Sequence, residues 1–121
     1  MKVKCVKLLD SRGNPQDKSP WLTLGKVYHV LSLIFGTQQK WLVRLIGDGL
    51  NGVALFPLDQ FEVVSPKLPG RWIVTWSNNG VFELTAEAWS RPGFWEQFYD
   101  QDGDARKIFE VERISIVQDD P

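Results

Sequence analysis

Three carboxylates between residues 100 and 104 have the spacing that comes nearest to a metal site in this chain. Asp100, Asp102 and Asp104 lie two residues apart, as at the start of a calcium-binding loop. Such a loop also needs a glycine for its turn and a bidentate glutamate at its end, where this chain has Ala105 and Val111. The sequence therefore predicts no calcium site. It favours an acidic loop that either caps a helix or faces a basic partner.

Nucleophiles and other metal ligands are scarce. The chain has one histidine and one cysteine, so His29 and Cys5 are its single possible imidazole–thiol pair, and both fall in expected strands. We interpret His29 as structural, and one cysteine provides neither an intrachain disulfide nor a sulfur-ligated metal site. Glu110 and Glu112 are interpreted as exposed carboxylates rather than an acid–base pair. We therefore expect a protein that is not an enzyme and that uses no metal or cofactor.

Aromatic rings crowd residues 87–104, which we call the aromatic–acidic segment. One interpretation is a pair of short helices packed on a neighbouring hairpin. The other is a surface whose rings fill pockets on a partner while nearby carboxylates set its orientation. For this second interpretation the predicted partner-binding residues are Glu87, Trp89, Phe94, Trp95, Glu96, Tyr99, Asp100, Asp102 and Asp104.

Composition limits the class of protein. Apolar residues make up 43% and charged residues 24%, as in ordinary globular proteins. Residues 1–65 carry 8 Lys and Arg against 5 Asp and Glu, a net +3, and residues 66–121 carry 6 against 10, a net −4. Nucleic-acid binders usually show a much stronger basic surface, so nucleic acid is not the expected partner. The acidic half suits a basic protein instead.

The chain shows no targeting or membrane signal. Its first residues lack the apolar run of a signal peptide, and no stretch approaches the roughly 20 apolar residues of a membrane span. Together with the single cysteine, this predicts a protein of the reducing cytoplasm that has no membrane contact.

Short alternating segments predict an antiparallel β structure in the first half. A polar loop follows the first segment, glycine-rich turns separate the middle ones, and a one-turn 3₁₀ helix at 57–60 precedes the last. The expected strands are 2–9, 26–35, 40–47, 53–56 and 61–65.

The second half begins after a proline-rich linker at 65–70. A hairpin of strands 71–77 and 81–84 is expected, with a type I′ turn at Asn78-Asn79-Gly80. Thr85 is the expected N-cap of a helical turn, and 94–99 a second short helix. A third helix over 105–112 would be capped by Asp102 or Asp104. The final expectations are a strand at 113–117 and a frayed end at 118–121.

Residues 22–65 resemble a Src-homology-3-like barrel. The family pattern is a leucine-rich entry to a strand after a long first loop and an aromatic residue opening the third strand. A glycine, apolar residues, Phe-Pro, a one-turn 3₁₀ helix and an aromatic residue leading into the last strand then follow. Here it reads Leu22-Thr23-Leu24-Gly25, Trp41, Gly52, Leu55-Phe56-Pro57 and Phe61-Glu62-Val63-Val64. The resemblance implies a mainly β (α+β) fold with a barrel over 1–65. A hairpin with short helices over 70–117 would pack on the barrel as one cooperative unit.

In this family a proline-rich peptide docks between aromatic rings, and the matching positions would be Trp41, Pro57 and Phe61. The first strand lacks the tyrosines of that groove, and the long loop mixes basic with acidic residues. We interpret the rings as barrel core rather than as a peptide groove.

The second half is similar to small bacterial immunity proteins, which protect a cell from toxins of its kin. The shared features are a strand pair followed by Trp89-Ser90-Arg91-Pro92-Gly93-Phe94-Trp95-Glu96, an aromatic pair and an acidic stretch. This resemblance implies stoichiometric binding of a cognate toxin, for instance a basic nuclease domain. The alternatives are a bacterial or phage-derived adaptor domain and, from the basic first half, a nucleic-acid-binding barrel. The oligomeric state stays open.

Overall fold

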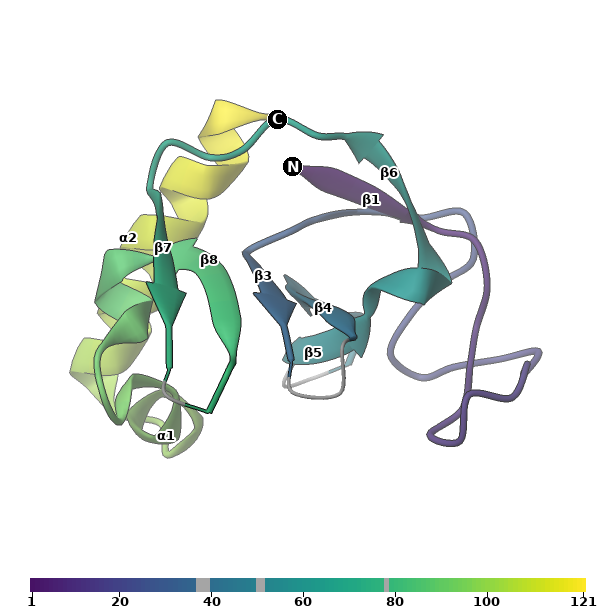
Figure 1. Ribbon diagram of the computed structural model, residues 1–121, viewed down its shortest axis with the longest axis horizontal. Helices are drawn as coiled ribbons and strands as arrows, with labels where there is room; N and C mark the ends of the chain where they lie inside the picture. Colours follow the sequence, from purple (N-terminus) through teal and green to yellow (C-terminus); the bar gives the residue numbers. More distant parts are fainter. Residues whose placement is uncertain (37–39, 50–51, 78) are drawn as a thin grey trace.

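The computed structural model describes residues 1–36, 40–49, 52–77 and 79–121 (Figure 1). Its strands and helices form two antiparallel sheets with helices beside the second, so the expectation of a mainly β chain with helices is confirmed. In chain order the elements are β1 (Lys2–Cys5), β2 (Val27–His29), β3 (Ser32–Phe35), β4 (Trp41–Ile46), β5 (Val53–Pro57), η1 (Leu58–Gln60), β6 (Phe61–Ser65), β7 (Trp72–Trp76), β8 (Phe82–Ala86), η2 (Glu87–Ser90), α1 (Phe94–Tyr99) and α2 (Gly103–Asp119).

The three-stranded sheet has the order β2-β1-β6. Its central strand buries Val3 and Cys5, and the alternating lysines of β1 point away from the core. The expected strand 26–35 is divided into two, because the chain changes sheet at Val30 and Leu31. Val30 N–H donates to Met1 O at 3.0 Å in the first sheet, and Leu31 N–H donates to Arg44 O at 2.7 Å in the second.

The five-stranded sheet has the order β5-β4-β3-β8-β7 and contains strands from both halves of the chain. The join is the antiparallel pairing of β3 with β8, in which Leu33 lies opposite Leu84. The β7–β8 hairpin predicted from the sequence is confirmed. Its turn includes residue 78, which lies outside the described residues.

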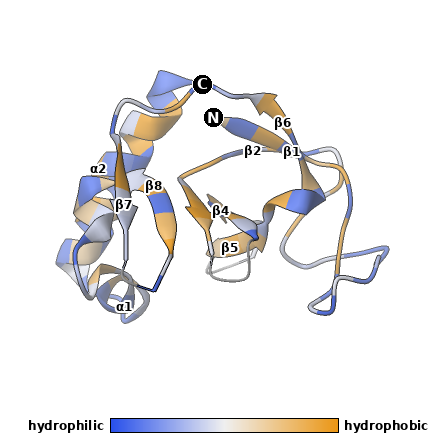
Figure 2. Ribbon diagram, in the orientation of Figure 1, coloured by the Kyte–Doolittle hydropathy of each residue, from blue (hydrophilic) through white to orange (hydrophobic). Residues whose placement is uncertain are grey.

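Two hydrophobic cores lie on the two faces of the five-stranded sheet. The first fills the space between the sheets and is mostly aliphatic, with Val3, Val43 and Leu45 fully buried. The second lies under the helices and is largely aromatic. Trp72 packs against both, and its indole N–H donates to Leu31 O at 2.9 Å. Figure 2 shows apolar residues along the strands and an alternation of apolar and polar residues along α2.

Helix α2 is much longer than expected, and the predicted strand at 113–117 is wrong. Its buried residues are Ala105, Phe109, Glu112 and Ile116, whose spacing is that of one helix face. The helical spacing of buried residues extends from 105 to 116, whereas the alternation that predicted a strand covers only five residues. The longer helical pattern therefore determines the structure. The predicted cap at Asp102 is confirmed, because its carboxylate accepts from Ala105 N–H at 2.9 Å.

Two further local predictions are wrong. Thr85 is a residue of β8, where its hydroxyl lies 2.8 Å from Ser32 Oγ, and the helical turn begins only at Glu87. Glu112 is buried rather than exposed, and both of its carboxylate oxygens accept from the Arg71 guanidinium at 2.7 Å. Burial of that carboxylate is tolerated because it is paired.

The chain end at 118–121 is held in place, so the expectation of fraying is wrong. Lys2 Nζ donates to Pro121 O at 2.8 Å, and Ser65 Oγ donates to the Asp120 carboxylate at 2.5 Å. His29 Nε2 lies 2.8 Å from Asp120 O, a structural contact. These contacts place both ends of the chain side by side (Figure 1).

Candidate protein interface

The rings of the aromatic–acidic segment build the second core. Trp89 and Phe98 are each 2% exposed, and Phe94 is also buried. Trp89 stacks on Phe109 of α2 with centroids 5.2 Å apart, and Phe98 lies 4.7 Å from the same ring. The structure thus shows a helix pair packed on the sheet. Trp89 and Phe94, two predicted partner-binding residues, lie inside the protein.

The other two predicted rings are more accessible. Trp95 is half-buried, and the Arg44 guanidinium lies 4.1 Å from its ring centroid. Tyr99 is 47% exposed, and its hydroxyl donates to Val53 O at 2.5 Å. Burial raises the pKa of the Tyr99 hydroxyl, against the charges of Arg44 and Arg106. Tyr99 therefore combines a surface position with a fixed orientation.

The five carboxylates of the segment are all exposed, and we call this set the acidic end. Among the described residues, no Lys, Arg or His side chain lies within ion-pair distance of any of them. Carboxylates elsewhere behave differently: Glu83, Glu110 and Glu112 each pair with an arginine at 3.0 Å or less. The members of the acidic end are Glu87, Glu96, Asp100, Asp102 and Asp104.

Not every member is free to meet a partner. The Asp102 carboxylate is committed to the N-terminus of α2. Glu96 and Asp100 lie one turn apart at α1, so they are on the same side of that helix. These two are the best placed to act together.

The buried guanidinium of Arg44 contacts α1 through the ring of Trp95. Arg44 is 8% exposed, and its Nη1 donates to Glu83 Oε2 at 3.0 Å and to Ser32 Oγ at 3.3 Å. Burial lowers the pKa of the Arg44 guanidinium, while the charge of Glu83 opposes that shift. Our sequence reasoning missed this residue. The available signal was a single arginine inside the otherwise apolar run Trp41–Ile46.

A hollow of about 280 Å³ opens beside the acidic end, between η2, α1 and the β7–β8 hairpin. Trp89, Arg91 and Glu96 are among its lining residues. The Trp89 indole nitrogen has no hydrogen-bond partner among the described residues. A partner side chain could enter this hollow next to Glu96 of the acidic end.

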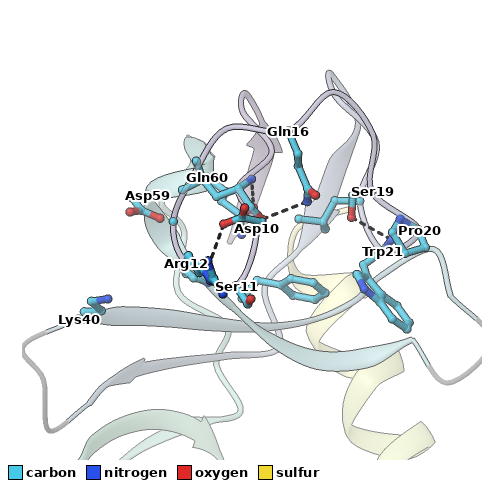
Figure 3. Close-up of a pocket in the computed structure, with 15 residues that line it drawn as sticks. Asp10, Ser11, Arg12, Gln16, Ser19, Pro20, Trp21, Lys40, Asp59 and Gln60 are labelled. Carbon is cyan, nitrogen blue, oxygen red and sulfur yellow. Dashed lines mark hydrogen bonds between the residues drawn. The ribbon is translucent and has the colours of Figure 1, made fainter.

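A larger groove of about 480 Å³ lies between the long loop after β1 and the β5–η1 corner (Figure 3). The loop is ordered by hydrogen bonds, since Asp10 Oδ1 accepts from Arg12 N–H and Asn14 N–H at 2.9 Å. Gln60 Oε1 also accepts from Leu9 N–H at 3.0 Å. The rim carries charges of both signs.

This groove holds one of the three positions weighed for peptide binding. Pro57 lines it, Trp41 is not among its lining residues, and Phe61 is buried in the first core. The interpretation of these rings as core holds for Phe61. It is wrong for Trp41, which is exposed and packs against Phe35 with centroids 4.8 Å apart.

Asp48, which follows β4, is the acceptor at the centre of a second polar cluster. Its carboxylate accepts from Lys26 Nζ at 2.6 Å, from Thr23 Oγ1 at 2.6 Å and from the Tyr28 hydroxyl at 3.1 Å. The hydrogen bond from Lys26, followed by that from Thr23, lowers the pKa of Asp48. Three side-chain donors satisfy the Asp48 carboxylate, whereas Asp102 alone in the acidic end accepts a hydrogen bond among the described residues, and it does so from a main-chain N–H.

No cluster of three or more His, Cys, Asp or Glu suited to a metal ion occurs in the described ranges. None of the helices described there is long and apolar enough to span a bilayer. Comparisons with protein-family models, with curated proteins and with solved structures found no match.

Proposed function

We propose that this chain is a protein-binding module whose partner contacts the acidic end. The observation that carries this proposal is a set of five exposed carboxylates that have no ion-pair partner among the described residues, on a segment whose rings form a buried aromatic core. Apart from Asp102, which caps α2, these unpaired surface carboxylates contribute little to stability and are available for intermolecular pairing. The rigid core beneath reduces the ordering cost of binding.

The proposed partner is a basic protein. Complementary charge accelerates encounter and fixes orientation, and exposed Tyr99 would add apolar area next to the carboxylates. The finer proposal is a cytoplasmic bacterial immunity protein that blocks a toxin by occlusion. Its support is the sequence pattern Trp89–Glu96 and the fact that nucleases present basic surfaces to phosphates.

The finer description of the fold, a Src-homology-3-like barrel, belongs to the same proposal. Pairing of β1 with both β2 and β6 supports it, as does the single 3₁₀ turn between β5 and β6. In this view the barrel is scaffold, and the added hairpin and helices carry the interface.

The test uses the polypeptide encoded immediately upstream of this chain's gene. Mixed with the purified chain, it is expected to form a one-to-one complex by light scattering and to lose its toxicity when both are expressed together. A one-to-one complex without neutralisation would favour the adaptor function. Absence of both a complex and protection would contradict the proposal.

A further inference from the structure

We infer that β7 pairs with β7 of a second copy of this chain and joins two five-stranded sheets into one. Strand β7 is the outer strand of its sheet. It also carries Trp76, 79% exposed, and Val74, 60% exposed, on the sheet face opposite the helices. This inference is independent of the proposed function, because the acidic end takes no part in it.

The hydrogen-bond phase of the hairpin leaves the outer groups of β7 free. Ser77 N–H donates to Val81 O at 2.9 Å, so Ser77 faces β8. Because direction alternates along an antiparallel strand, Thr75 and Ile73 also bond to β8, and the main-chain groups of Val74 and Trp76 point outward. Among the described residues, no main-chain hydrogen bond outside the sheet involves Val74 or Trp76.

The other sheet edges carry the usual protection against pairing, and β7 does not. Strand β5 ends in Pro57, β6 contains Glu62, and β2 is only three residues long. From Trp72 to Val81 the chain has no charged residue and no proline. An uncharged edge with exposed apolar side chains is a template for another strand.

A second copy fits this edge through a two-fold axis at Thr75. Antiparallel pairing about that point places Val74 of each copy opposite Trp76 of the other, and all four residues have outward main-chain groups. The pairing closes four hydrogen bonds and brings the two most exposed side chains of β7 together on one face.

The absence of charged residues on this edge also favours a second copy of the chain as the occupant. Two identical surfaces can meet only where no like charges oppose each other, and the uncharged stretch of β7 satisfies this condition. In a register centred on Val74, the Trp72 N–H of each copy already donates to Pro69 O at 3.2 Å, so only four of six hydrogen bonds could form. The register centred on Thr75 also forms four hydrogen bonds, and none of its donors is already engaged in the described residues.

The first experiment measures mass against concentration by sedimentation equilibrium. The wild-type chain is expected to move from 13.9 kDa toward twice that mass between micromolar and millimolar concentration. Val74→Lys and Trp76→Lys are each expected to remain at the lower mass. Val64→Lys, at a similarly exposed valine on the edge strand β6, is the matched control and should dimerise like the wild type.

The second experiment tests the register. Residues on such an axis have Cα atoms about 4.5 Å apart, within the disulfide range of about 4.4 to 6.8 Å. Thr75→Cys is expected to form a disulfide-linked dimer, whereas Val64→Cys is not, and the native Cys5 is buried. A wild type that stays at 13.9 kDa, or a dimer unaffected by Val74→Lys, would overturn the inference.

Discussion

The aromatic–acidic segment and strand β7 use the same residue types in opposite ways. In the segment Trp89, Phe94 and Phe98 are buried and the carboxylates face solvent. In β7 the ring of Trp76 faces solvent, and the strand has no charge. The difference shows that aromatic density does not identify an interface: rings form a core where helices can cover them, and they stay exposed at an uncovered sheet edge.

This contrast assigns different kinds of contact to the two regions. The acidic end can attract a basic protein over a distance, since its carboxylates have no ion-pair partner among the described residues. Strand β7 offers short-range main-chain hydrogen bonds and apolar area, which suit a strand from a second copy.

The largest expected effect concerns ring burial. Phe98→Ala should lower the free energy of unfolding by about 3 to 5 kcal/mol, because it empties the centre of the aromatic core. Trp76→Ala should change it by less than about 0.5 kcal/mol at a concentration where the chain is monomeric. Urea unfolding measures both. Similar losses of unfolding free energy in the two variants would contradict the distinction between the buried rings of the segment and the exposed ring of β7.

A smaller effect separates two carboxylates within the acidic end. Asp102→Ala should cost about 1 kcal/mol, because the α2 N-cap loses its hydrogen bond to Ala105 N–H. Asp100→Ala, two residues earlier, removes an exposed carboxylate and should leave the unfolding midpoint nearly unchanged. If both variants behaved alike in thermal melts, the assignment of Asp102 to structure and Asp100 to surface would be wrong.

The smallest expected effect is the acid response of Asp48. Its pKa is lowered in the folded state, so its stabilising contribution is present above the unfolded pKa and is lost as pH falls through the folded value. Asp48→Asn should flatten the loss of stability on acidification below about pH 4. Asp100→Asn is the control and should keep the wild-type acid response, because no cationic group of the described residues pairs with that carboxylate. Unfolding midpoints from pH 2 to 7 would show an unflattened Asp48→Asn profile if the cluster contributes nothing.

Much of the fold could be predicted from the sequence, because the deciding signals are local. Alternation located the strands, Pro57 marked the 3₁₀ turn, and Asp102 marked the start of α2. The pairing of β3 with β8 could not be predicted, because the residues of a strand do not indicate which other strand it pairs with. The docking of Asp120 likewise depends on residues far away in sequence.

The candidate site was predictable only in part. Exposure of the acidic end follows from charge, but burial of Trp89 and Phe98 depends on Phe109, a ring of α2 that covers them. The six-residue helix α1 is too short for its own pattern to reveal that cover. The exposure of Trp76 depends on β7 being the last strand of its sheet.

The most direct test of the proposed interface is calorimetric titration of the upstream gene product with the wild type and two charge-matched variants. Glu96→Lys with Asp100→Lys should weaken binding at least about tenfold and reduce its salt dependence. Asp59→Lys with Glu62→Lys makes the same change in net charge at exposed carboxylates of the first half, and should bind like the wild type. Equal affinity for all three proteins would contradict the assignment of the acidic end as the partner surface.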